Sequence, residues 1–113
     1  MSTTLIHVTA TDNELYLLAI EEGSETYERS GLYSSELLHI KSGFSDKVNY
    51  QFRPGACLAP GNYTLVMIGI NWGGPQAFKV TLTTNGAPDV HEFPLANTPP
   101  GTVWSEAVPI TVP

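Results

Sequence analysis

The chain has 113 residues, a net charge of −6 and 42% hydrophobic residues, so it is long enough for one domain with a core and too short for two. Charged residues make up only 14%, below the roughly 25% of an average soluble domain. With 10 Gly and 9 Pro, this composition favours β-structure joined by turns over a helical bundle. The acidic balance and the scattered basic residues argue against a nucleic-acid partner.

The single cysteine, Cys57, rules out an intramolecular disulfide, so packing alone must hold the domain together. We expect Cys57 to be structural and at least half-buried, because no activating base stands beside it. The first residues contain no basic leader, and no stretch approaches the roughly 20 apolar residues that a membrane span requires. The sequence therefore predicts a cytoplasmic protein without a signal peptide or membrane span, with leaderless export left open.

The first half of the chain predicts a series of short strands separated by polar turns. Three strands are expected at Thr4–Ala10, Leu15–Glu21 and Ser35–Lys41. Residues 25–33 fit a loop or a short irregular strand. The segment Lys47–Arg53 alternates apolar and polar residues, which is typical of a half-buried strand.

The second half of the chain is patterned more sharply. Tyr63–Ile70 is apolar on both faces, which predicts a central strand or a strand with one face covered by a second subunit. Phe78–Leu82 alternates strictly and is expected to form a hairpin with the preceding strand, with Asn71–Gln76 at its tip. Asn85-Gly86 is a strong signal for a two-residue turn.

Proline interrupts the last third of the chain, and it cannot donate a hydrogen bond to a neighbouring strand. Val90–Leu95 and Thr102–Val112 are therefore predicted to be edge strands. Four apolar residues of the last strand share one parity and are expected to face inward: Trp104, Val108, Ile110 and Val112. Seven or eight short strands over residues 1–113 predict a single all-β antiparallel sandwich, similar to immunoglobulin or jelly-roll architectures, with a small β-barrel as the alternative.

Catalytic and metal-binding signatures are absent from the sequence. The histidines His7, His39 and His91 lack zinc-ligand spacing, and no glycine-rich phosphate loop precedes a helix. His91 and Glu92 are strand neighbours that point to opposite faces, so they cannot act on one atom. The stretch Asp12–Glu14 lacks the spacing of a calcium loop. We therefore predict no enzymatic activity, no metal and no cofactor.

The segment Asn71–Gln76 is the most informative candidate site. Its glycines let the backbone approach a ligand closely, and an exposed tryptophan offers a flat apolar face beside amide side chains. The predicted ligand-binding residues are Asn71, Trp72, Gly73, Gly74 and Gln76. In the alternative interpretation, the tryptophan folds back and caps the core.

These features favour a non-catalytic carbohydrate-binding module that resembles a small lectin. The alternative is a protein-interaction module, such as an inhibitor or an assembly component. The expected partner is accordingly a glycan or a protein. Self-association as a homodimer is also expected, because Tyr63–Ile70 is apolar on both faces and low charge gives little repulsion.

Overall fold

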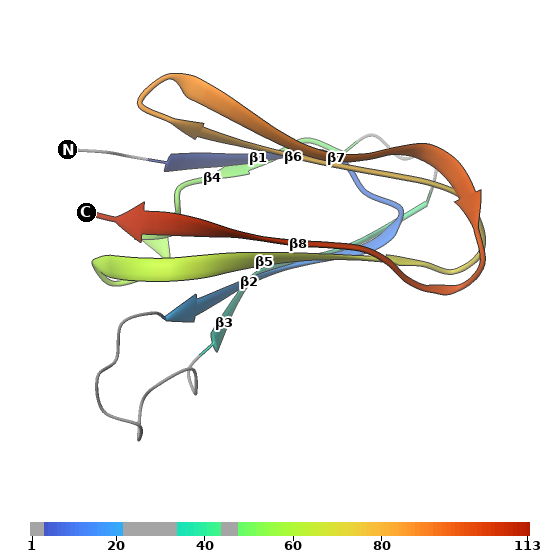
Figure 1. The fold of residues 1–113 in the computed structure, drawn as a ribbon, viewed down its shortest axis with the longest axis horizontal. Coiled ribbons are helices and arrows are strands. Elements are labelled where there is room, and N and C mark those ends of the chain that lie inside the picture. Colours follow the sequence, from blue (N-terminus) through green and yellow to red (C-terminus); the bar gives the residue numbers. More distant parts are fainter. Residues whose placement is uncertain (1–3, 22–33, 44–47) are drawn as a thin grey trace.

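Two four-stranded antiparallel sheets form the described part of the chain, residues 4–21, 34–43 and 48–113 of a computed structural model (Figure 1). Sheet A has the strand order β4-β1-β6-β7, and sheet B has the order β3-β2-β5-β8. The strands are β1 (Thr4–Ala10), β2 (Asn13–Glu21), β3 (Ser34–Ser42), β4 (Tyr50–Phe52), β5 (Gly61–Asn71), β6 (Gly74–Thr84), β7 (Ala87–Thr98) and β8 (Gly101–Val112). The sheets lie as an upper and a lower layer in Figure 1 and do not close into a barrel, so the sandwich is confirmed.

The core lies between the two sheets because each strand turns alternate side chains inward. In β5, for example, Tyr63, Leu65 and Met67 are buried, while Val66 and Ile68 on the outer face are only half-buried. The buried apolar side chains are Ile6, Val8, Leu15, Leu17, Ala19, Ile40, Tyr63, Leu65, Met67, Phe78, Val80, Leu82, Ile110 and Val112. Both sheets contribute to this set, as a two-layer architecture requires.

The strand predictions hold for most of the chain. β1 has the expected bounds, β5 is central in its sheet, and β7 and β8 are edge strands. β4 is shorter than expected, and Tyr50 within it is 48% exposed because this strand lies at the edge of sheet A. The segment 25–33 lies outside the described residues, as do residues 44–47.

The predicted hairpin of β5 and β6 is wrong. The two strands follow each other along the chain but lie in different sheets, so their link crosses from sheet B to sheet A. The two strands do not pair by hydrogen bonds, and their inward-facing side chains pack against each other across the core. A Cβ atom placed on Gly69 would lie only 2.8 Å from Cζ of Phe78, so the glycine makes room for the ring. Alternation reveals which face of a strand is buried, but not which sheet the strand joins.

The turn at Asn85-Gly86 is a true hairpin turn, as predicted. It joins β6 to β7 within sheet A, with Thr84 opposite Ala87. Both turn residues have positive φ, 53° at Asn85 and 82° at Gly86, which is the backbone that this residue pair favours.

Two further expectations concern single side chains. Trp104 is inward-facing as predicted, and it stacks on Phe78 with ring centroids 5.7 Å apart. Cys57 is exposed, contrary to expectation. It follows a single 3₁₀ turn, Pro54–Ala56, in which Pro54 is buried, and Leu58 then packs against the core. The inward positions are therefore already taken on both sides of the cysteine.

In the part of the chain that the structure describes, no helix is long and apolar enough to cross a membrane.

Candidate functional site

The link between β5 and β6 is held by a buried asparagine. Asn71 is fully buried, and its Nδ2 donates to the carbonyl oxygen of Gly74 at 2.9 Å, to that of Thr98 at 3.0 Å and to Oγ1 of Thr98 at 2.7 Å. These bonds tie the β5–β6 link to the end of β7. Gly73 and Gly74 have φ values of 118° and 89°, a backbone region that favours glycine. The two glycines therefore supply the backbone conformation that the link requires.

Trp72 stands at the outside of this link with 56% of its surface exposed. Its backbone N–H donates to Oδ1 of Asn13 at 2.7 Å, and its indole Nε1 donates to Oε2 of Glu14 at 3.0 Å. Both N–H groups of the residue are thus satisfied by β2 while the ring remains accessible. This arrangement disagrees with the interpretation of Trp72 as a cap over the core.

The indole is one end of a polar and aromatic row that continues across sheet B. The second oxygen of the carboxylate, Oε1 of Glu14, lies 3.0 Å from Nε2 of His39 on β3. The imidazole of His39 stacks on Tyr16, with ring centroids 4.0 Å apart and an interplanar angle of 10°. We refer to Trp72, Asn13, Glu14, His39 and Tyr16 together as the Trp72 platform.

Glu14 is the residue that links the members of the Trp72 platform. Each of its carboxylate oxygens accepts a hydrogen bond, one from the indole of Trp72 and one from the imidazole of His39. These two bonds, the one from Trp72 first, lower the pKa of Glu14 below its usual value. The carboxylate is therefore ionised at neutral pH and holds two rings from different strands in fixed positions.

The five predicted site residues separate into two groups. Trp72 and Gly73 are exposed and Gly74 is half-buried, whereas Asn71 and Gln76 are fully buried. Neither polar atom of the Gln76 amide has a hydrogen-bond partner among the described residues. In this conformation neither buried amide reaches the surface, so the accessible part of the predicted site is Trp72 with its glycines.

Sequence reasoning did not find the other members of the Trp72 platform. Asn13 and Glu14 were considered only as weak calcium candidates, and Tyr16 and His39 were assigned no role. They come together because β2 pairs with both β3 and β5, so that Tyr16 lies opposite His39 and Glu14 lies opposite Ile70. Only knowledge of this strand order brings them next to the tryptophan.

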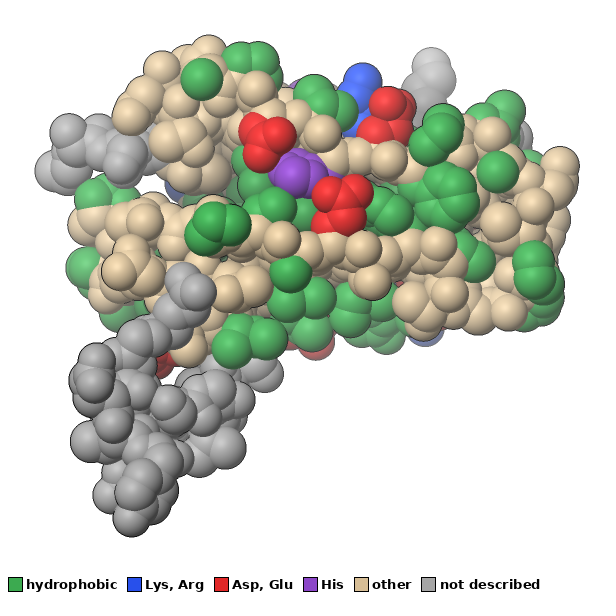
Figure 2. Space-filling model, in the orientation of Figure 1, with side chains coloured by type: hydrophobic (Ala, Val, Ile, Leu, Met, Phe, Trp, Pro, Cys, Tyr) green, Lys and Arg blue, Asp and Glu red, His purple; other side chains and the backbone are tan. Residues whose placement is uncertain are grey.

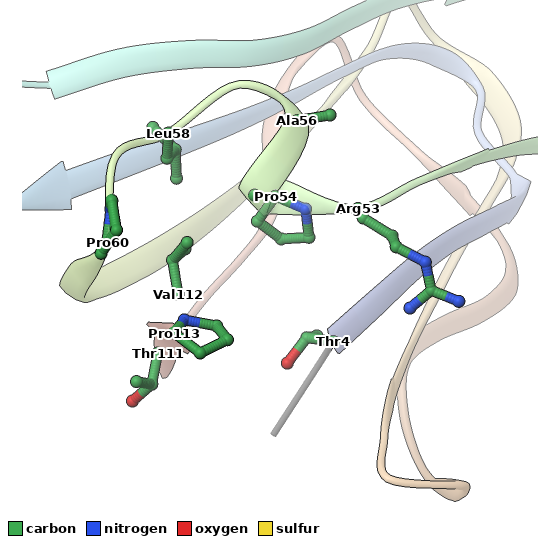
Figure 3. A pocket seen from close by; sticks show the side chains of 10 residues that line it. Thr4, Arg53, Pro54, Ala56, Leu58, Pro60, Thr111, Val112 and Pro113 are labelled. Carbon is green, nitrogen blue, oxygen red and sulfur yellow. The ribbon is translucent and has the colours of Figure 1, made fainter. Parts of the chain in front are cut away.

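Among the residues that the structure covers, no group of three or more His, Cys, Asp or Glu side chains is arranged so that it could hold a metal ion. An apolar pocket of about 300 Å³ lies between the 3₁₀ turn and the last residues of β8 (Figure 3). Pro54, Leu58 and Val112 line it, and Arg53 is the one charged side chain that the described residues contribute to the lining. The pocket offers an apolar wall but few directed polar groups.

The whole chain was compared with known protein families, sequences and structures. No protein-family model, no curated protein sequence and no solved structure matched it.

Proposed function

We propose that this chain is a non-catalytic carbohydrate-binding module and that the Trp72 platform is its sugar-binding surface. The observation that carries the proposal is that Trp72 is 56% exposed although it is held in place, its indole by a hydrogen bond to Glu14 and its backbone N–H by one to Asn13. An aromatic ring that is exposed and already positioned loses little freedom when a ligand stacks on it.

A sugar matches the chemistry of this surface. The C–H face of a pyranose is apolar and stacks on an aromatic ring, while its hydroxyl groups need polar partners close by. Glu14 and His39 provide such polar groups beside the indole. Glu36 adds a second carboxylate, with Oε1 4.0 Å from Nδ1 of His39. Two carboxylates would repel an acidic sugar, so we expect the preferred ligand to be uncharged.

A glycan array is the direct test of this proposal. We expect the unmodified chain to bind neutral glycans, and Trp72→Ala to abolish that binding while the far-ultraviolet circular dichroism spectrum stays unchanged. Tyr50→Ala is the matched control, because it removes another aromatic ring that is 48% exposed but lies on sheet A. Silence of the unmodified chain on the array, or equal loss in both variants, contradicts the proposal.

The second candidate function is protein interaction, beginning with self-association. The outer face of sheet B favours it, because half-buried apolar side chains of β2 and β5 lie side by side there: Leu18 opposite Val66, and Tyr16 opposite Ile68. A second copy seated on this face would remove these side chains from water. We therefore propose a homodimer that forms through the outer face of sheet B. Light scattering at tens of micromolar measures the mass of the unmodified chain and should give that of a dimer.

The charge variant Ile68→Glu tests this dimer. It places a carboxylate in the middle of the outer face, where an interface would have to bury it unpaired. We expect the dimer mass to fall to that of a monomer in this variant and to persist in Thr81→Glu, a matched change at a half-buried position of sheet A. A monomeric unmodified chain overturns the dimer but leaves sugar binding intact. We also propose a cytoplasmic location, because the chain has a single cysteine and therefore no intramolecular disulfide that would need an oxidising compartment.

A further inference from the structure

The two sheets meet along one open side, where the edge strands β7 and β8 face each other (Figure 1). No backbone ladder joins these strands, because they belong to different sheets. Along β7, the positions opposite the buried apolar residues of β6 are Phe93, His91 and Asp89. Along β8, Glu106 lies opposite the buried Met67. Ionisable side chains thus occupy inward-facing positions where the pattern of the neighbouring strands is apolar.

These side chains form a continuous bridge between the sheets. Nδ1 of His91 lies 2.6 Å from Oε1 of Glu106, and Nε2 of His91 lies 2.8 Å from Oδ2 of Asp89. Nε1 of Trp104 donates to Oε2 of Glu106 at 2.9 Å. Figure 2 shows a histidine between acidic side chains in the middle of this face. The His91 side chain is only 12% exposed, whereas Asp89 is 66% exposed.

Both ring nitrogens of His91 face carboxylate oxygens, which act only as acceptors when they are ionised. Two hydrogen bonds therefore require a proton on each nitrogen, which is the imidazolium form. Burial alone lowers the pKa of His91, but the hydrogen bonds to Glu106 and Asp89 outweigh burial and raise the pKa above its usual value.

The remaining neighbours of His91 do not compete for its proton. Val80, its partner on β6, is apolar, and the other charged residues nearby on sheet A, Lys79 and Glu92, lie opposite each other on the other face. From β8, Glu106 faces the ring and Trp104 donates to that same carboxylate. Among the described residues, the two carboxylates Asp89 and Glu106 are thus the charges that His91 meets.

We propose that His91, Glu106 and Asp89 form a pH-sensitive latch across the open side of the sandwich, closed while His91 is protonated and released when it loses a proton. Loss of one ring proton leaves a nitrogen lone pair facing a carboxylate oxygen, so one of the two bonds is replaced by repulsion. The stabilisation by the latch is complete below the unfolded-state pKa of about 6.5 and is lost as the pH rises through the folded-state pKa.

The latch stands at the end of a groove between the two sheets. This groove has a volume of about 520 Å³ and is lined by Leu82, Val108 and Ile110 along with Asp89, a member of the latch. On the other side of the latch, Trp104 stacks on the buried Phe78. Release of the latch would therefore extend an apolar groove toward Trp104, which makes this indole a natural reporter.

The test follows acrylamide quenching of Trp104 in a Trp72→Phe background, where Trp104 is the only tryptophan. We expect the quenching constant to rise between about pH 5 and about pH 9, with a midpoint equal to that of the His91 ring signals in nuclear magnetic resonance spectra. Adding His91→Gln should remove this transition, and adding His7→Gln, a histidine on β1 that belongs neither to the latch nor to the Trp72 platform, should leave it unchanged. A flat titration, or a transition that persists in His91→Gln, overturns the latch.

Glu106→Gln provides a second readout if His91→Gln does not fold. It keeps the shape of the side chain but removes the charge that favours the protonated ring, so the midpoint should move to lower pH. An unchanged midpoint overturns the latch. Apart from the Trp72→Phe background that all samples share, these variants leave the Trp72 platform unchanged. The result is therefore independent of sugar binding.

Discussion

Replacing Trp72 by alanine should cost the domain little stability, although tryptophan is its largest side chain. The indole is 56% exposed, and the bond from the backbone N–H to Asn13 remains when the side chain is removed. What is lost is one hydrogen bond from Nε1 to the carboxylate of Glu14, which keeps its bond from His39, and part of the ring's contact with the surface. We expect the free energy of unfolding to fall by about 1 kcal/mol.

Equilibrium unfolding in urea, followed by far-ultraviolet circular dichroism, measures this change without relying on the tryptophan signal. Phe78→Ala is the comparison for a core position, because this ring is fully buried, and it should cost about 3–5 kcal/mol. Tyr50→Ala serves as the exposed comparison and should stay within about 0.5 kcal/mol of the unmodified chain. A loss of about 3 kcal/mol or more for Trp72→Ala would refute the reasoning, since it would make Trp72 a core residue.

Two further predictions concern the packing of the core and the pH response of the platform. Gly69→Ala should lower the free energy of unfolding by about 1–3 kcal/mol, because the new Cβ would lie 2.8–2.9 Å from three ring atoms of Phe78. Gly55→Ala is the control and should be nearly neutral, because its new Cβ would meet only an ordinary contact at 3.6 Å. Urea unfolding of both variants measures the two changes. The lowered pKa of Glu14 means that its stabilising contribution is present above the unfolded-state pKa of about 4.3 and is lost as the pH falls through the folded-state value. In a variant whose only tryptophan is Trp72, we expect the emission to change in that acidic range, and an emission that stays constant until the whole domain unfolds would contradict the Glu14 contact.

The layers of the fold were predictable from sequence because alternation reports burial directly. The period of two in Phe78–Leu82 and the prolines of the last third identified an inward face and two edge strands, and the structure confirms both. The partner sheet of each strand was not predictable. β5 and β6 were expected to pair, yet the requirement to bury both inward faces places Phe78 over Gly69 from opposite sheets.

The candidate site shows the same division between local and non-local information. Glycine geometry and the prominence of Trp72 are local features, and sequence reasoning found them. The companions of Trp72 come from β2 and β3, which are distant in sequence, and only strand pairing brings Glu14 and His39 beside the indole. The latch was missed for a related reason. His91 was compared with its neighbour Glu92, although strand geometry places Asp89, two residues away, on the same face.

Titration of the isotope-labelled protein with neutral monosaccharides tests the central claim most directly, because each of the two tryptophans gives its own indole N–H signal. Glucose, galactose, mannose and N-acetylglucosamine are suitable probes. We predict that at least one of them shifts the signal of Trp72, whose ring is exposed, and leaves that of Trp104, which stacks on the core, in place. If all four sugars leave the Trp72 signal unmoved at saturating concentrations, or if the shifts gather around Trp104, the Trp72 platform is not a sugar-binding surface.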